Sequence, residues 1–129
     1  HGYMVDLRQE RIQKVQVPDL EVDGDQDFEL LVVGWGSTWG AIKGAVTRAC
    51  KDGYKIGHVH LRHLNPLPSN LGELLSKATK VLVPEMNLGQ LSKIIRAEYL
   101  IDAKSITKVK GVPFTAGELD QVLREALDD

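Results

Sequence analysis

Short apolar runs alternate with amphipathic segments along this chain, and this alternation constrains the fold more than any other feature. Three of the runs lead into distinctive loops, GWGSTWG at 34–40, RHLNPLP at 62–68 and PEMNLGQ at 84–90. Strands that alternate with helices are typical of a largely parallel sheet with helices on both faces. Because the carboxyl ends of parallel strands meet at one edge of a sheet, the three loops are expected to share that edge.

Hydrophobic periodicity predicts where the helices and strands lie. Thr115 and Glu118 fit a capping box at the start of the last helix, in which Leu123 is expected to be deeply buried and Arg124 to face outward. Ile94 is expected on the buried face of its helix. The expected strands are at 28–33, 55–64, 80–85 and 104–110. The expected helices are at 39–51, at about 89–100 and at 115–126, with a further short helix that includes Leu74 and Leu75.

The amino-terminal part of the chain has a different character. The sequence MVDLRQERIQKVQ at 4–16 predicts a connecting helix with a ragged apolar stripe. In the acidic segment that follows, Leu20 and Val22 alternate with charged residues, as in a short edge strand. We therefore expect residues 1–27 to form a linker helix and an edge strand, and residues 28–129 to form one domain.

Composition excludes several classes of protein. A chain of 129 residues suits one domain with its own core. The 16 Lys and Arg residues are interspersed with 18 Asp and Glu residues, which argues against nucleic-acid binding through a basic face. Cys50 is the only cysteine, so no intrachain disulfide is possible and a reducing compartment is favoured. Since no apolar run suits a signal peptide or a membrane span, we expect a cytoplasmic protein without nucleic-acid or membrane partners.

The GWGSTWG loop has the spacing G-x-G-x-x-x-G, which invites comparison with dinucleotide-binding loops. Such a site also needs an acidic residue near the end of the next strand, where this sequence has Arg62 and His63. Trp35 and Trp39 would also crowd a diphosphate. Glycines that permit a tight strand-to-helix turn are therefore the favoured interpretation. A small nucleotide-binding module using the loop from Gly34 to Gly40 remains the alternative.

No complete catalytic or metal site is visible in the sequence. His58 and His60 share one face of an expected strand, but His63 points to the opposite face, so a zinc site is not favoured. Glu85 follows a buried strand and could act as a general acid or base. Because no second catalytic group stands near it, a structural role is the favoured interpretation, either capping of the following helix or binding of a neighbouring backbone N–H. We assign no catalytic, cofactor-binding or metal-ligating residue.

Four blocks of the sequence resemble a known family: LLVVGWGSTWGAIKGAV, GHVHLRHLNPLPSNLGELL, KVLVPEMNLGQLSKIIRAEYLIDA and ITKVKGVPFTAGEL. They cover about residues 28 to 119 and resemble the carboxyl-terminal domain of the α subunit of 2-oxoacid:ferredoxin oxidoreductases, most closely the 2-oxoglutarate type. The pattern is more distantly similar to the carboxyl-terminal domain of the transketolase superfamily. The resemblance implies a three-layer α/β/α domain whose mostly parallel five-stranded sheet has one antiparallel edge strand, which would give the segment from Leu20 to Val22 a place.

The same resemblance implies membership of a thiamine-diphosphate enzyme that decarboxylates a 2-oxoacid, forms an acyl-coenzyme A and reduces ferredoxin. Such enzymes bind thiamine diphosphate and magnesium through a G-D-G motif and carry iron–sulfur clusters. This chain has only Asp23-Gly24-Asp25 and a single cysteine, so we expect none of these cofactors in it and no activity from the isolated domain. The implied partners are the other domains of the α subunit and the β subunit, with ferredoxin and coenzyme A for the whole enzyme.

The loop residues are therefore interpreted as a docking surface rather than an active site. Tryptophan is costly to leave in water and is common among interface anchors, and the turn Asn-Pro-Leu-Pro loses little entropy on association. An interaction domain of unrelated origin would differ only in its partner. We call the predicted docking surface the rim, and it comprises Trp35, Trp39, His63, Asn65, Pro66, Glu85 and Asn87.

Overall fold

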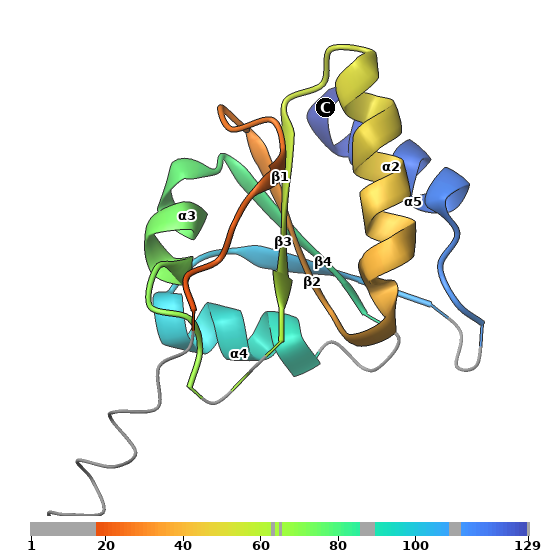
Figure 1. Ribbon diagram of the computed structural model, residues 1–129. Coiled ribbons are helices and arrows are strands. Elements are labelled where there is room, and N and C mark those ends of the chain that lie inside the picture. The colour runs from red at the N-terminus through yellow and green to blue at the C-terminus, as the bar shows by residue number, and fades with distance from the viewer. Residues whose placement is uncertain (1–17, 63, 65, 86–89, 109–111, 129) are drawn as a thin grey trace, which may run out of the picture.

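The computed structural model describes residues 18–62, 64, 66–85, 90–108 and 112–128, and these form a five-stranded sheet with helices on both faces (Figure 1). The expected helix at 4–16 lies outside the described residues. The strands are β1 (Asp23–Gly24), β2 (Leu30–Trp35), β3 (Ile56–Leu61), β4 (Lys80–Glu85) and β5 (Ala103–Thr107). The helices are η1 (Gly36–Thr38), α2 (Trp39–Lys51), α3 (Leu71–Lys77), α4 (Gln90–Tyr99) and α5 (Ala116–Asp128).

The strand order is β1-β3-β2-β4-β5, and β2 lies at the centre. Strands β3, β2, β4 and β5 run parallel, whereas β1 pairs antiparallel with β3 at the edge of the sheet. The expected mostly parallel sheet with one antiparallel edge strand is confirmed. The edge strand itself begins at Asp23, just beyond the expected segment from Leu20 to Val22. Leu20 and Val22 instead pack against the core on one face of the sheet.

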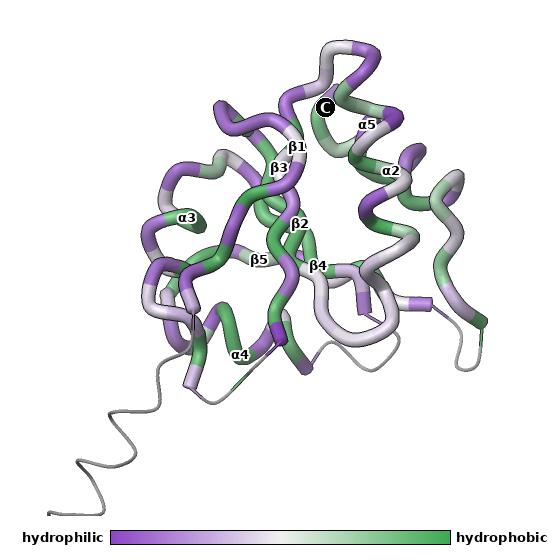
Figure 2. Tube along the Cα trace, viewed as in Figure 1, coloured by the Kyte–Doolittle hydropathy of each residue, from purple (hydrophilic) through white to green (hydrophobic). Residues whose placement is uncertain are grey.

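Alternate residues of the central strand serve opposite faces of the sheet, which makes three layers. Leu31 and Val33 join one core cluster with residues of α3 and α4, whereas Leu30 and Val32 join a second cluster with residues of α2 and α5. Figure 1 shows α2 and α5 on one side of the sheet and α3 and α4 on the other. The hydropathy colouring in Figure 2 shows the central strands as hydrophobic, while several turns are hydrophilic.

The expected boundaries agree best where local signals are strong. Helix α2 and strand β4 occupy the expected residues, 39–51 and 80–85. Strand β2 continues to Trp35 instead of ending before Gly34, because Gly34 and Trp35 still pair with His60 and Leu61 of β3. Strand β3 accordingly ends at Leu61, where this pairing stops.

The last helix shows two confirmed predictions and one error. The Thr115 hydroxyl accepts a hydrogen bond from the Glu118 N–H at 3.1 Å, and the Glu118 carboxylate accepts one from the Thr115 N–H at 3.3 Å, which is the expected capping box. Leu123 is fully buried, as expected. Arg124 does not face outward: its guanidinium lies 2.7 Å from both Asp52 and Asp120. The turn after α2 brings Asp52 within reach, so Arg124 ties α5 to the end of α2.

Candidate functional site

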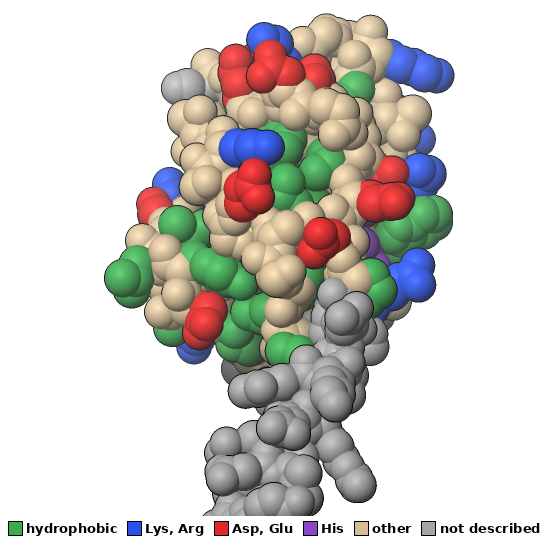
Figure 3. Space-filling model, turned by 60° about the vertical axis from the view of Figure 1, so that its left-hand side comes forward, with side chains coloured by type: hydrophobic (Ala, Val, Ile, Leu, Met, Phe, Trp, Pro, Cys, Tyr) green, Lys and Arg blue, Asp and Glu red, His purple; other side chains and the backbone are tan. Residues whose placement is uncertain are grey.

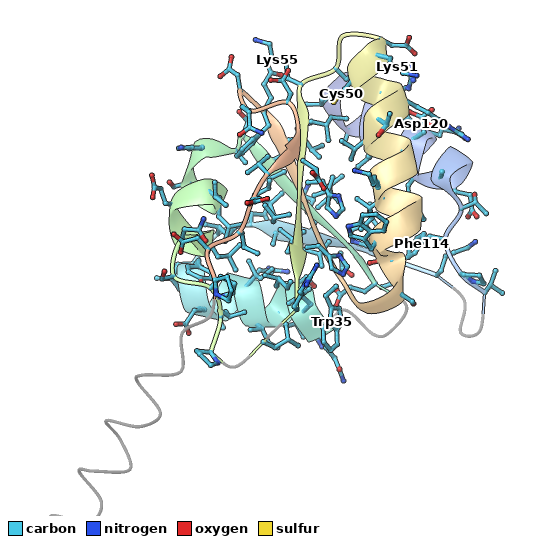
Figure 4. All side chains as sticks on the ribbon, viewed as in Figure 1. Trp35, Cys50, Lys51, Lys55, Phe114 and Asp120 are labelled. Carbon is cyan, nitrogen blue, oxygen red and sulfur yellow. The ribbon has the colours of Figure 1, made fainter. Side chains whose placement is uncertain are left out.

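Two exposed tryptophans mark the carboxyl edge of the sheet. Trp35 ends β2 and is 39% exposed, and Trp39 begins α2 and is 46% exposed. Between them the chain turns sharply, and Gly36 has a positive φ of 68° that a residue with a side chain would adopt only with strain. The Thr38 hydroxyl closes the turn by donating to the Trp35 carbonyl at 2.9 Å. Figure 4 labels Trp35 at this edge, with Cys50 at the other end of α2.

The glycine-rich loop therefore has structural reasons for its composition. Gly36 supplies the left-handed turn, and a side chain on Gly34 would place its Cβ 2.5 Å from Cδ1 of Ile42. These two requirements come from the turn and from the packing of α2 against β2. They support the interpretation of the loop as a tight strand-to-helix turn.

Glu85 ends β4 and is 4% exposed, and its carboxylate is engaged by three donors. It accepts hydrogen bonds from the N–H groups of Leu91 at 2.5 Å and Ser92 at 3.3 Å, and from the Ser105 hydroxyl at 3.0 Å. A carboxylate at the amino end of a helix satisfies N–H groups that the helix itself cannot. Glu85 thus caps α4 and joins it to β4 and β5, which agrees with the favoured interpretation.

The described part of the rim does not form one continuous pocket. A groove of about 190 Å³ lies between η1 and the first half of α4, and Trp35 and Glu85 line it. A second groove, of about 430 Å³, runs along the edge strand and includes Trp39. Pro66 is exposed, and His63, Asn65 and Asn87 lie outside the described residues.

Both grooves contain residues that the sequence did not single out for the rim. Ile94 was expected to be buried, but it is 40% exposed and lines the 190 Å³ groove beside Leu64. Only Leu91, Ser92 and Ile95 of α4 are buried, so the buried stripe of this helix is narrower than its apolar pattern. Arg62 lines the 430 Å³ groove. The sequence could have indicated this, because Arg62 is two residues from His60 and is expected on the same face of the strand.

The 430 Å³ groove has an acidic wall and an aromatic one. Asp19 and Glu21, from the segment that leads into β1, line it together with Asp23 of β1 and Trp39 of α2. The Lys43 ammonium lies 3.9 Å from the Asp23 carboxylate and 5.5 Å from the centre of the Trp39 ring. In Figure 3 acidic side chains are scattered over the face that turns forward, and little purple histidine surface is visible beside hydrophobic and basic side chains.

His60 of β3 lines this groove, and His58, two residues earlier on the same strand, is buried. Burial is the main cause that lowers the pKa of His58 to about 4, with the neighbouring His60 adding to it. Burial also lowers the pKa of His60, opposed by a hydrogen bond to the backbone of Gly36. Both imidazoles are therefore neutral at pH 7.

The described residues do not fit the metal-dependent cofactors that the resemblance implies. Among them, no group of three or more His, Cys, Asp or Glu side chains could hold a metal ion. An iron–sulfur cluster needs several cysteine ligands, and Cys50 is the only cysteine of the sequence.

Among the residues that the structure describes, no helix is both long and apolar enough to span a membrane.

Comparison with known proteins gives a consistent picture. A family model described as pyruvate:ferredoxin oxidoreductase core domain II matches residues 29–119. The 2-oxoglutarate oxidoreductase subunit KorA of Mycobacterium tuberculosis is 53% identical over 128 residues, which are 98% of this chain and 20% of that protein. Subunit alpha of 2-oxoacid:ferredoxin oxidoreductase 1 from Aeropyrum pernix is 36% identical over 88% of this chain and 20% of that protein. The chain thus spans about a fifth of the length of these curated relatives.

Two solved structures share the fold. The 2-oxoglutarate:ferredoxin oxidoreductase of Magnetococcus marinus, solved with 2-oxoglutarate, coenzyme A and succinyl-CoA bound, superposes with a TM-score of 0.82 at 30% identity, over 92% of this chain and 21% of that one. The alpha chain of a probable 2-oxoacid ferredoxin oxidoreductase from Thermoplasma acidophilum has a TM-score of 0.59 at 24% identity, over 86% of this chain and 98% of that one. This second likeness concerns the fold alone.

Proposed function

Since the chain belongs to the pyruvate:ferredoxin oxidoreductase core domain II family, we propose that it is the interface domain of the α subunit of a 2-oxoglutarate:ferredoxin oxidoreductase. The observation that carries this proposal is the identity to a 2-oxoglutarate oxidoreductase subunit along almost the whole chain. In this proposal residues 28–129 form the domain and residues 1–27 connect it to the rest of the subunit.

The whole enzyme would decarboxylate 2-oxoglutarate, transfer the acyl group to coenzyme A and reduce ferredoxin in the cytoplasm. Thiamine diphosphate, magnesium and an iron–sulfur cluster would be held by its other domains and by the β subunit, because the described residues do not fit them. The chain's own contribution would be to hold those parts in place.

The rim is the proposed contact surface. Trp35 and Trp39 are large apolar side chains that remain substantially exposed, and tryptophan is among the residue types that most often dominate binding energy. Pro66 is exposed too, and in the sequence His63 and Asn65 precede it while Asn87 follows the end of β4. Glu85 would act indirectly, because its carboxylate is already used to hold the start of α4.

The test compares Trp39→Ala with Leu100→Ala in the assembled enzyme. Trp39 and Leu100 are both exposed apolar residues, but Leu100 follows α4 and is not part of the rim. Truncation of an interface anchor typically costs about 2 kcal/mol or more, so Trp39→Ala should weaken association of the domain or subunits by at least about tenfold. Leu100→Ala should have little effect on association.

Two further measurements separate docking from catalysis. The melting temperature of the isolated chain should change little in Trp39→Ala, because about half of the side chain is exposed. Variants that assemble normally and retain their cofactors but lose turnover would instead place the rim in the active site, and the proposal would be wrong.

A further inference from the structure

A pair of neighbouring histidines, the buried His58 and the partly buried His60, lies beneath α2 and is not part of the rim. His58 is 1% exposed, and neither of its ring nitrogens has a hydrogen-bond partner among the described residues. Nδ1 of His60 is likewise buried without a partner. The two rings meet edge to face, with centroids 6.0 Å apart. Buried polar atoms without partners are rare in native proteins, so this pair needs an explanation.

The two rings converge over Gly34 of the central strand. A Cβ on Gly34 would lie 3.1 Å from Nδ1 of His60, 3.4 Å from Nε2 of His58 and 2.5 Å from Cδ1 of Ile42. Because Ile42 belongs to α2, the pair lies between the sheet and the first half of that helix. A change in the charge of either ring therefore changes the electrostatic environment of the first half of α2.

The charged groups around the pair are few. Strand β2 has the sequence LLVVGW and contributes no titratable side chain. Asp23 of β1 and Lys43 of α2 act on His58, as does its neighbour His60 on β3, while Arg62 acts on His60. Asp23 is the acidic group among them, and it lies directly opposite His58 in the antiparallel pair. Directly opposed residues in such a pair project to the same face of the sheet.

Asp23 already has a cationic partner. Its carboxylate lies 3.9 Å from the Lys43 ammonium, and both side chains are about half exposed, at 52% and 48%. The same ammonium lies 5.5 Å from the centre of the Trp39 ring. His58 is thus linked to Asp23 by strand pairing and by charge, and Asp23 is linked through Lys43 to one of the exposed tryptophans of the rim.

We propose that His58 is an acid sensor: its protonation draws the Asp23 carboxylate away from Lys43 and thereby changes the environment of Trp39. A neutral imidazole does not need Asp23 as a counter-ion, whereas a buried imidazolium is stable only with a carboxylate beside it. The contact between Asp23 and Lys43 is long and half exposed, so it is weak enough to be exchanged. At neutral pH the arrangement stays in the form seen in the structure, because burial and His60 lower the pKa of His58.

The sensor does not depend on the proposed docking function, although the two together would make contacts of the rim weaker or stronger in acid. The experiment therefore uses the 129-residue chain alone, so that failure of one proposal leaves the other intact. A Trp35→Phe background leaves Trp39 as the only tryptophan of the sequence. Trp39 fluorescence, the His58 ring signals in NMR and the helical circular dichroism are followed from pH 7 to pH 3.5.

The expected result is one step in Trp39 fluorescence, below pH 6, with the same midpoint as the titration of His58 and with constant helical signal. In Asp23→Asn, His58 should titrate at lower pH, because Asp23 raises its pKa, and the Trp39 signal should no longer follow it. In His58→Gln the step should be absent. If His58→Gln does not fold, the Asp23→Asn variant still decides the question.

Three results would overturn the proposal. The first is a Trp39 step that persists unchanged in Asp23→Asn. The second is titration of His58 without any change at Trp39. The third is a Trp39 change that coincides with loss of the helical signal, because that change would report unfolding.

Discussion

The carboxylate of Glu85 accepts a hydrogen bond of 2.5 Å from the backbone N–H of Leu91, so the end of β4 caps the start of α4. Two further donors, the Ser92 N–H and the Ser105 hydroxyl, leave this buried carboxylate well satisfied. The residue that most resembled a catalytic acid or base in the sequence is therefore part of the scaffold beneath the rim.

Glu85→Ala should lower the free energy of unfolding by about 2–3 kcal/mol, because it removes a helix cap and leaves buried donors unpaired. Ser105→Ala removes only one of the three bonds and should cost about 1 kcal/mol. The denaturant midpoints of the two variants measure the difference. Equal small effects would show that the carboxylate does not stabilise α4.

Leu123→Ala should cost about 2–5 kcal/mol, because Leu123 is fully buried between α5 and the sheet. Gln121→Ala, at an exposed position of the same helix, is the matched control and should change the unfolding midpoint little. Arg124→Ala should fall between them and should become less harmful at high salt, because Arg124 bridges Asp52 and Asp120. Equal effects of Leu123→Ala and Gln121→Ala would mean that the buried face of α5 has been assigned incorrectly.

Gly34→Ala and Gly40→Ala should have opposite effects on stability. The Cβ added at Gly34 would press on Ile42 and on His60, so this variant should be destabilised by about 1–3 kcal/mol. At Gly40, inside α2, an added Cβ meets nothing within 4 Å, and alanine should stabilise the helix by about 0.5–1 kcal/mol. Thermal unfolding distinguishes the signs. Destabilisation by both substitutions would argue against a purely structural role for the glycine-rich loop.

Stability should fall as the pH is lowered, with His58 as one cause. Its pKa is lowered to about 4 in the folded state, so between about pH 6.5 and pH 4 the unfolded chain binds a proton that the folded chain does not. The contribution of His58 is therefore present above pH 6.5 and is lost through this window, amounting to about 3 kcal/mol at most. Urea unfolding of His58→Leu at several pH values should show a shallower loss than the unsubstituted chain. Parallel curves would mean that His58 titrates normally.

Thiamine diphosphate with magnesium should not raise the melting temperature of the 129-residue chain. A ligand that binds the native state must raise it, and the described residues offer no metal-binding cluster. The same differential scanning calorimetry with NAD or ADP tests the nucleotide-binding alternative. A rise of several degrees with any of these ligands would contradict the assignment of the chain as an interface domain.

Features that depend on neighbouring residues in sequence could be predicted. The bounds of α2 and β4 follow from apolar periodicity, and the capping box of Thr115 and Glu118 from a pattern four residues long. The alternation of strands and helices also predicted a parallel sheet with covered faces, because each apolar face must be buried against another element. An edge strand was expected from the alternation at Leu20 and Val22, but its antiparallel direction was implied only by the family resemblance.

Features that depend on distant parts of the chain were decided only by the tertiary structure. Arg124 turns toward Asp52, 72 positions away by residue number, and Ile94 is left exposed because the sheet covers only a narrow stripe of α4. The periodicity of a helix shows which residues share a face, but not how wide a neighbouring element will be. Likewise, the sequence placed His58 and His60 on one face of a strand, whereas only the approach of β1 and α2 determined that His58 would be buried, that His60 would be partly buried and that Asp23 would stand opposite His58.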